Sequence, residues 1–341
     1  MSASLTVEVC GPATSVQDAG RVGVLRFGLS SAGAMDRFAL AAANALTGAG
    51  PAQAAIEIGP LPARFVAKDA PVRAALSGAA REASAGGRKL APARSFVLAP
   101  GEALELKAAR GGLYTYLAVA GGIVGKPVFG SLSVHARAGL GGPIPRPLRA
   151  GDSLTVGADP GGEDLSLPPA AAPEAGPIRV VLGPQDDFFS QAQIAEFLGA
   201  EWRVALASDR MGYRLDGPKI AAARGHNIVS DGIANGAIQI PGGGQPLVLL
   251  ADRGTTGGYP KIACIATCDL GRFAQTPPGG TLRFEAIGIE SAQRLARDFE
   301  AAIEGLRKRA VAGGGTTSEA LLAANLAGRA VNALDAGTWD A

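Results

Sequence analysis

Short runs of alternating apolar and polar residues recur along the chain and predict β-strands. In LTVEVCGP, residues 5–12, Leu5, Val7 and Val9 alternate with polar residues, which is the period of a half-buried strand. IRVVLGP, residues 178–184, ends in the same Gly-Pro. A Gly-rich turn followed by a strand-like run occurs three times, as PGEALEL, AGDSLTV and PGGTLRF at residues 100–106, 150–156 and 278–284. This repetition predicts a sandwich or barrel architecture.

Helical periodicity is limited to a few segments. MDRFALAAANALTG, residues 35–48, has apolar residues at helical spacing, and Asp36 is placed to cap its N-terminus. FFSQAQIAEFLG, residues 188–199, has the same form. The segment from Ile289 to Leu306 gathers its apolar residues on one face and ends in basic residues. We therefore predict a mainly β protein with a few short helices and a C-terminal helix.

The chain divides into two halves that begin and end alike. Residues 157–177 are rich in Pro, Gly and Ala and have no periodicity, which is typical of a linker. We predict an N-terminal domain at 1–160, a linker at 161–177, a C-terminal domain with its closing helix at 178–310, and a tail at 311–341. We assign no function to the tail.

Composition narrows the class of protein. The 341 residues are 47% hydrophobic and carry a net charge of +2, enough apolar material for packed cores and no basic cluster for nucleic acid. The N-terminus lacks the pattern of a signal peptide, and no apolar run reaches ~18 residues. With three cysteines and two histidines, we expect neither a disulfide framework nor a metal site. We expect a cytoplasmic protein that contacts no membrane.

Familiar cofactor motifs are absent or incomplete. AGGIVGKP, residues 120–127, has Ala120 where a P-loop needs glycine, and Pro127 where it needs Ser or Thr. GLSSAG, residues 28–33, lacks the spacing of a nucleophile elbow. No lysine lies in a Met-Lys-Met setting for biotin attachment. The chemistry must therefore come from other polar residues.

Three Gly-containing polar segments remain as candidates, at 15–23, 208–218 and 230–241. Asp18 and Arg21 either contribute to catalysis or only tie a turn together. Arg210, Tyr213 and Arg214 could bind a carboxylate or phosphate in a bidentate manner, or the arginines could only form a surface salt-bridge pair. From these segments we predict catalytic roles for Asp18 and Arg21, and substrate binding by Gln17, Arg210, Tyr213, Arg214, Ser230, Asp231 and Gln239.

A fourth candidate is the loop DRGTTGGYPKIA, residues 252–263. Threonines and glycines between two strands can turn several N–H groups inward, making a concavity for an anion or an oxyanion. The alternative is a β-bulge hairpin with incidental hydroxyls. We expect Gly257 and Gly258 to supply positive φ or close backbone approach. The predicted catalytic residues here are Thr255, Thr256, Gly257, Gly258 and Tyr259, and the predicted substrate-binding residues are Asp252 and Lys261.

Longer motifs, in order, resemble a known family. QDAGRVG, GAMDRFALAAANALTG, AAIEIG, RMGYRLDGP, GAIQIPGGGQPLVLLADRGTTGGYPKIA and CDLGRFAQTPPG are similar to the family of the 5-oxoprolinase C subunit (PxpC). That family is also called KipA-like, allophanate hydrolase subunit 2, or biotin-dependent carboxyltransferase. Three positions in two segments depart from it. Leu132 and Val134 stand where the family usually has Arg and Thr, and Gly254 stands where it usually has Gln.

The resemblance implies a fold, partners and an activity. It implies two tandem cyclophilin-like β-barrel domains. It further implies a complex with a KipI-like B subunit and a LamB/YcsF-like A subunit, which opens the small-molecule substrate 5-oxo-L-proline to L-glutamate with ATP. Two alternatives stay open. One is the carboxyltransferase half of a urea-type carboxylase, with biotin attached to another chain. The other is a non-catalytic partner of a KipI-like regulator.

Overall fold

The computed structural model describes residues 2–168 and 176–312. Strands dominate both halves, and the helices are α1 (Arg37–Leu46), α2 (Gln191–Gly199), α3 (Leu270–Ala274) and α4 (Ile289–Arg309) among these residues. Single 3-10 turns are η1 (Leu25–Phe27), η2 (Ala136–Ala138), η3 (Asp186–Phe188) and η4 (Thr267–Asp269). The prediction of a mainly β protein with few helices and a C-terminal helix is confirmed. No described helix is long and apolar enough to cross a membrane.

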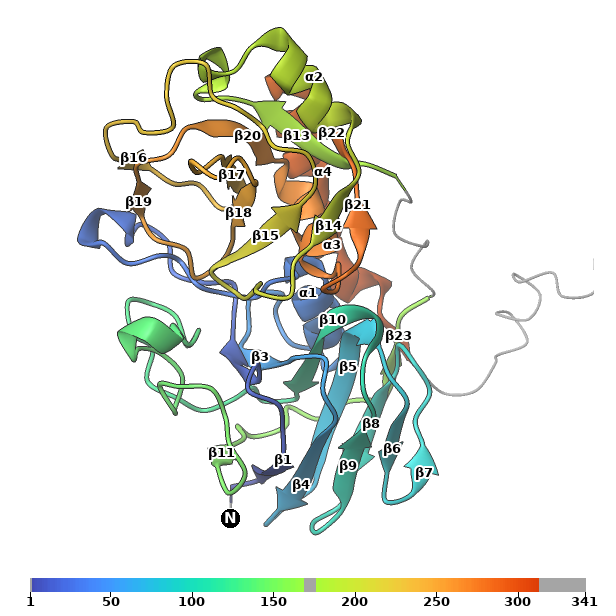
Figure 1. The fold of residues 1–341 in the computed structure, drawn as a ribbon. Helices are drawn as coiled ribbons and strands as arrows, with labels where there is room; N and C mark the ends of the chain where they lie inside the picture. Colours follow the sequence, from blue (N-terminus) through green and yellow to red (C-terminus); the bar gives the residue numbers. More distant parts are fainter. Residues whose placement is uncertain (1, 169–175, 313–341) are drawn as a thin grey trace, which may run out of the picture.

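The N-terminal half consists of two antiparallel sheets around one apolar core (Figure 1). The core gathers side chains such as Leu5, Ile56, Phe65 and Leu117, all 0% exposed. One sheet has the order β11-β1-β4-β9-β6-β7 and the other β2-β3-β10-β5-β8. Their strands are β1 (Ser4–Val9), β2 (Ser15–Gln17), β3 (Ala55–Ile58), β4 (Ala63–Lys68), β5 (Val72–Ala80), β6 (Ala83–Ala85), β7 (Arg88–Lys89), β8 (Ser95–Leu98), β9 (Ala103–Leu106), β10 (Arg110–Val119) and β11 (Ser153–Thr155).

The C-terminal half is built on one eight-stranded sheet of order β21-β14-β15-β18-β17-β20-β13-β22. The first and last strands of this order are joined through the single residue Arg283, so the sheet nearly closes into a barrel. Its strands are β13 (Ile178–Leu182), β14 (Trp202–Val204), β15 (Gly212–Asp216), β17 (Ala237–Gln239), β18 (Leu247–Leu249), β20 (Lys261–Ile265), β21 (Thr281–Leu282) and β22 (Phe284–Ala286). A two-stranded ribbon, β16 (Asp231–Gly232) with β19 (Thr256–Gly257), lies apart from this sheet.

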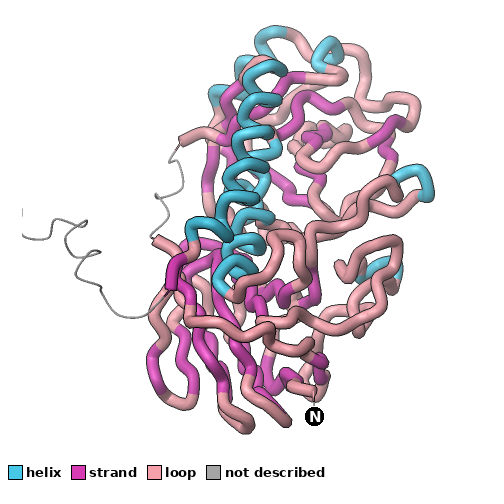
Figure 2. The backbone as a smooth tube through the Cα atoms, turned by 180° about the vertical axis from the view of Figure 1, so that it is seen from behind, coloured by secondary structure: helices cyan, strands magenta, loops and turns pink. Residues whose placement is uncertain are grey.

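Helices connect the two halves. Viewed from behind, the long helix α4 runs along the C-terminal half and reaches the N-terminal half (Figure 2). There Ile303 and Leu306 pack on Ala41 and Ala45 of α1, and Arg37 makes two bonds to Glu300, at 2.6 and 3.0 Å. The C-terminal part of the apolar face predicted for 289–306 therefore packs against the other half of the chain, whereas Ile289 at its start is 58% exposed.

The predicted helix cap and the predicted linker have different outcomes. The Asp36 carboxylate accepts the Ala39 N–H at 3.0 Å, so the predicted cap of α1 is confirmed. Within the predicted linker, β12 (Leu165–Ser166) pairs with β23 (Val311–Ala312). A two-residue strand is too short to show a periodic pattern, so this pairing could not be predicted. The domain boundaries themselves stay a prediction.

Candidate functional site

Asp18 organises the first polar cluster. It follows β2 and is 8% exposed. Its Oδ1 accepts hydrogen bonds from the hydroxyls of Ser131 and Ser133, at 2.6 and 2.5 Å, and from the Gly20 N–H at 2.8 Å. Its Oδ2 accepts the Leu132 N–H at 2.6 Å. One buried carboxylate thus fixes segment 131–133 against the turn that follows β2.

Arg21 holds the same segment from the other side. Its Nε donates to the Val128 carbonyl at 3.1 Å, and its Nη2 donates to the Ser133 carbonyl. Within the described chain its Nη1 has no hydrogen-bond partner, although the residue is 2% exposed. Burial lowers the pKa of the guanidinium, and Asp18 and Asp252 oppose that shift. The described residues show no ion pair between Asp18 and Arg21, so the turn is tied through segment 128–133 instead.

Gln17 completes this cluster. It lies in β2 with 0% exposure, and its Nε2 donates to Ser15 Oγ and to the Val134 carbonyl, at 2.8 and 3.0 Å. Its Oε1 is buried without a partner in the described structure. Gln17 Oε1 and Arg21 Nη1 thus lie four residues apart in sequence, and both are buried without a hydrogen-bond partner among the described residues. Each could still form a hydrogen bond with a water or a ligand.

Arg210 and Asp252 form a second cluster that joins the two halves. The Arg210 guanidinium makes two bonds of 2.9 Å to the Asp252 carboxylate. It also donates to Glu57 Oε1 at 2.5 Å and to the Gly33 carbonyl at 2.8 Å. Burial favours the neutral guanidine, but Glu57 and Asp252 outweigh burial and raise the Arg210 pKa well above its ordinary value. The Arg210 guanidinium therefore binds two carboxylates of this chain, those of Asp252 and Glu57.

Tyr213 and Arg214, which follow Arg210 in the sequence, lie on opposite faces of β15. Tyr213 is 1% exposed, packs on Phe273, and donates its hydroxyl to the Ala274 carbonyl at 2.8 Å. Burial raises its pKa above the ordinary value, which keeps the hydroxyl a donor. Arg214, one residue further along β15, is exposed. Of the two, only Arg214 presents its side chain where a solvent-borne ligand can reach it.

The third cluster surrounds the β16–β19 ribbon. Lys261 is 2% exposed, and its Nζ donates to Asp231 Oδ2 at 2.8 Å. Gln185 connects to both, because its Nε2 donates to Asp231 at 3.3 Å and its Oε1 accepts the Lys261 N–H at 3.1 Å. The Lys261 hydrogen bond is the main cause of a lowered Asp231 pKa. Ser230, next to this pair, is exposed.

The TTGGY loop forms one strand of that ribbon. Gly257 pairs with Asp231, and the Thr255 carbonyl accepts the Ile233 N–H at 3.0 Å. Thr256 and Tyr259 are exposed and Thr255 is half-buried. In the described structure no hydrogen bond engages either threonine hydroxyl. The loop is a paired ribbon whose hydroxyls are unused, and its predicted catalytic role stays a prediction.

Of the two adjacent glycines in this loop, Gly257 is required for space, and neither is required for its conformation. Neither Gly257 nor Gly258 has a positive φ, so that part of the expectation is wrong. A Cβ on Gly257 would lie 2.6 Å from Gln239 Nε2 and 2.7 Å from Ile233 Cδ1. Gln239 itself is 4% exposed and donates weakly to the Tyr259 carbonyl, at 3.5 Å. Close approach is therefore the reason for glycine at 257, whereas Gly258 has ordinary contact distances.

The first two clusters are adjacent, and sequence reasoning missed several of their members. The Ala34 N–H donates to the Asp18 carbonyl at 2.9 Å, next to the Gly33 carbonyl that Arg210 binds. Glu57 could have been found, because a single acid in an apolar strand is itself a signal of a buried charge. The two serines of 131–133 flank Leu132, in the segment that departs from the motif of the family that the sequence resembles. Gln185 has no comparable signal.

Exposed apolar side chains border the clusters. Val22 is 95% and Phe27 63% exposed, and Phe27 stacks on Phe129 with ring centroids 6.3 Å apart. On the other half, Val229 and Leu206 are 91% and 88% exposed. Figure 1 shows the blue loop with η1, the green loop with η2 and the β16–β19 ribbon on the same side of the molecule. Apolar residues gathered beside polar clusters are typical of a protein-binding surface.

Comparison with known proteins shows which family this chain resembles. Residues 27–286 match the family model "Carboxyltransferase domain, subdomain A and B". The chain is 36% identical over 301 residues to the C subunit of 5-oxoprolinase from Escherichia coli (strain K12), covering 88% of this chain and 96% of that protein. It is 34% identical to the protein of the same name from Haemophilus influenzae, covering 86% and 94%.

A solved structure extends the comparison to a longer protein. The K. lactis urea amidolyase superimposes with a TM-score of 0.83 at 27% identity, covering 89% of this chain. This chain spans only 20% of that protein. The same pair of subdomains therefore occurs both in a chain of this length and inside a much longer one.

Proposed function

The chain belongs to the carboxyltransferase domain family, subdomains A and B, and from that premise we propose that it is the C subunit of an ATP-dependent 5-oxoprolinase. The resemblance stated from its motifs is confirmed by the family model and by the two relatives. In this proposal the chain works in the cytoplasm with a KipI-like B subunit and a LamB/YcsF-like A subunit. The complex opens 5-oxo-L-proline to L-glutamate.

One observation supports a shared site more than any other. The three polar clusters are largely satisfied internally. The first cluster adjoins exposed apolar side chains, because Val22 follows Arg21 and Phe129 follows Val128, whose carbonyl Arg21 binds, and Phe27 stacks on Phe129. A second protein covering these side chains would remove the polar loops from water, which strengthens hydrogen bonds to a developing oxyanion. The buried Nη1 of Arg21 is the donor in the first cluster with capacity left for such a group.

ATP fits another chain of the complex better than this one. The Gly-rich segment 120–127 follows β10 as a turn, and it leads to no helix in the described structure. A P-loop needs a strand, a glycine loop and a helix N-terminus around the phosphates. In the complex, ATP would supply the free energy for opening an unstrained lactam.

The test is reconstitution from purified chains. We expect this chain alone to form no glutamate from 5-oxoproline and ATP, and the three-subunit complex to do so. Phe27→Ser with Phe129→Ser should weaken binding to the KipI-like partner by at least about tenfold. Val97→Ser with Ile289→Ser, which changes apolar residues exposed elsewhere, is the matched control and should leave binding unchanged. Glutamate formed by this chain alone would contradict the shared site.

A second candidate is the carboxyltransferase half of a biotin-dependent urea carboxylase. The family model's description and the match to urea amidolyase favour it. Biotin would then arrive on another chain. The two candidates separate in one assay, because carboxylation of urea requires a biotinylated partner and bicarbonate, whereas opening of 5-oxoproline requires neither.

A further inference from the structure

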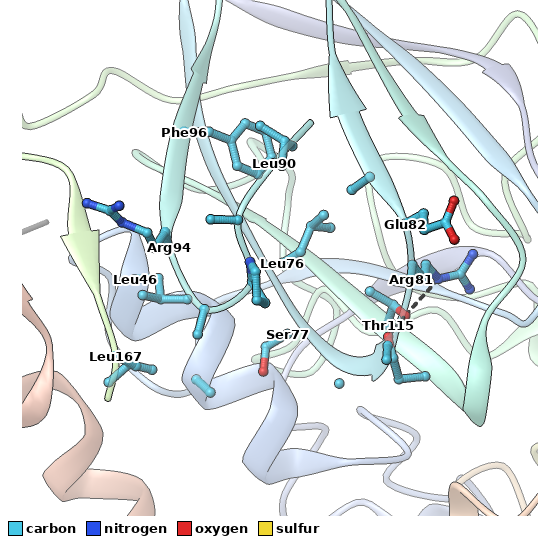
Figure 3. Close-up of a pocket in the computed structure, with 18 of the residues that line it drawn as sticks. Leu46, Leu76, Ser77, Arg81, Glu82, Leu90, Arg94, Phe96, Thr115 and Leu167 are labelled. Carbon is cyan, nitrogen blue, oxygen red and sulfur yellow. Dashed lines mark hydrogen bonds between the residues drawn. The ribbon is translucent and has the colours of Figure 1, made fainter. Parts of the chain in front are cut away.

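A cavity of about 530 Å³ lies in the N-terminal half. It is bounded by α1, by strands β5 and β8, and by the C-terminal end of α4. Figure 3 shows Leu76, Leu90 and Phe96 between Arg94 at one end and Arg81 at the other, with Leu46 and Leu167 at the Arg94 end. A volume of this size with a mainly apolar lining is typical of a small-molecule site.

The charged residues around this cavity are unbalanced. Arg81, Lys89, Arg94 and Arg309 line it, with Glu82 as its one carboxylate among the described residues. Glu82 is already paired, with Arg110 at 2.8 Å. In the part of the chain that the structure describes, no ion pair engages any of the four cations. The cavity therefore has positive charge that the described protein does not neutralise.

Arg81 shows this most clearly. Its Nε donates to Thr115 Oγ1 at 2.8 Å, and its Nη1 donates to the carbonyls of Leu61 and Lys107 at 2.9 and 3.0 Å. Its Nη2 donates to carbonyls of residues 58–59. All these acceptors are neutral, and burial lowers the pKa of the guanidinium to about 10. Arg81 thus contributes a positive field to the cavity without a free N–H for a direct bond.

Arg94 and Arg309 stand together at the other end. The backbone of Arg94 forms an antiparallel β-bridge with Ser166 of β12. Ser166 in turn pairs with Val311 of β23, which lies two residues after Arg309, so the two arginines are close along these paired backbones. Both arginines are exposed, so their guanidinium groups can reach a ligand head group at the opening. Leu167 follows the same strand into the apolar lining (Figure 3).

We propose that this cavity binds a small amphiphilic carboxylate, with its apolar chain among Leu76, Leu90 and Phe96 and its carboxylate at Arg94 and Arg309. The apolar lining selects the chain by burial, and the unpaired cations select a negative over a neutral head group. None of the residues that line the cavity belongs to the three polar clusters, and the proposal does not depend on the proposed 5-oxoprolinase activity.

Calorimetric titration of the full chain with sodium decanoate, below micelle-forming concentrations, tests the proposal. We expect one site with a dissociation constant of roughly 10–100 μM, weakened by added NaCl. Decan-1-ol, which has the same chain without the charge, should bind at least about tenfold more weakly. Arg94→Ala with Arg309→Ala should reduce decanoate affinity by roughly tenfold.

Matched controls separate the site from general charge. Arg88→Ala with Arg297→Ala removes two exposed arginines that do not line the cavity and should leave the affinity within twofold. Leu90→Trp should block binding by filling the cavity, provided that its melting temperature stays near that of the parent; if it fails to fold, the arginine variants decide. Absence of decanoate binding, equal binding of decanol, or equal losses in both double variants would overturn the proposal.

Discussion

At the scale of single residues, local roles were predictable and distant ones were not. The Asp36 cap spans three residues, so its partner follows from helix geometry. Arg210 binds Glu57, which lies 153 positions away, and no spacing rule connects such residues. The same segment, RMGYRLDG, places Tyr213 in the core and Arg214 outside, because side chains alternate along a strand. Sequence reasoning found many of the polar residues but missed Glu57 and Gln185, and it did not show which side chains are buried.

Arg210 gives the first prediction. Replacing Arg210 by Ala leaves Glu57, 0% exposed, and Asp252, 8% exposed, as buried carboxylates without their cation. We expect the free energy of unfolding to fall by about 3–5 kcal/mol, measured by urea denaturation. Arg224→Ala removes an exposed pair with Asp187 and should cost less than about 1 kcal/mol. Equal effects of the two variants would mean that the buried network contributes little.

At the scale of elements, strands and helices were predicted well where the pattern extended over several residues. The runs at 5–12 and 178–184 form β1 and β13, and 35–48 contains α1. Two-residue strands such as β12, β16 and β19 were missed, because two residues cannot display a period. From the sequence, the TTGGY loop could therefore form either an anion-binding concavity or a hairpin. The pairing of β19 with β16 shows that its backbone forms a ribbon, but it does not show what the threonine hydroxyls bind.

The second prediction concerns the hydroxyls of that ribbon. Thr255→Val with Thr256→Val removes two donors while nearly preserving shape. If they face a developing oxyanion in the assembled enzyme, turnover should fall by about 10²–10³, with melting temperature and subunit binding unchanged. Near-normal turnover would make the threonines structural. Gly257→Ala is the steric control, because its Cβ would collide with Gln239 and Ile233, and it should lower stability as well.

The third prediction is a pH dependence at η4 and α3. Burial favours a raised pKa for Asp269, but hydrogen bonds from Arg179 outweigh burial and lower it below the ordinary value of 3.8. A carboxyl with a lowered folded-state pKa stabilises the protein above its unfolded-state pKa, and this stabilisation is lost as pH falls through the folded-state value. The stability difference between the parent and Asp269→Asn should therefore be largest near neutral pH.

Acid titration of that difference is the measurement. Below about pH 4 it should shrink as Asp269 protonates. Asp298→Asn, an exposed position on α4, serves as the control and should follow the parent at every pH. A difference between parent and Asp269→Asn that stays constant from pH 7 to acid would show that the carboxylate charge does not stabilise this contact.

At the scale of the whole molecule, the two-part organisation was visible in the sequence but the shared core was not. One apolar core contains Met35, Leu40 and Tyr116 from the N-terminal half together with Ile262 and Phe273 from the C-terminal half. The repeated sequence pattern of a Gly-rich turn followed by a strand indicates two β units. The repeats do not predict how the two units pack, because the contacts in the shared core join residues that lie far apart along the chain.

This shared core leads to the fourth prediction, that the halves unfold as one. Leu40, 1% exposed in α1, packs in the shared core, and Leu40→Ala should lower the free energy of unfolding by about 2–5 kcal/mol. Native-state hydrogen exchange should show the slowest amides of β4 and of β20 losing the same amount of protection, since both exchange only through global unfolding. Leu206→Ala, 88% exposed, should change neither. Loss of protection confined to β4 would mean that the N-terminal half opens by itself, and the ion pairs and helices that join the halves would then be docking contacts between independent domains.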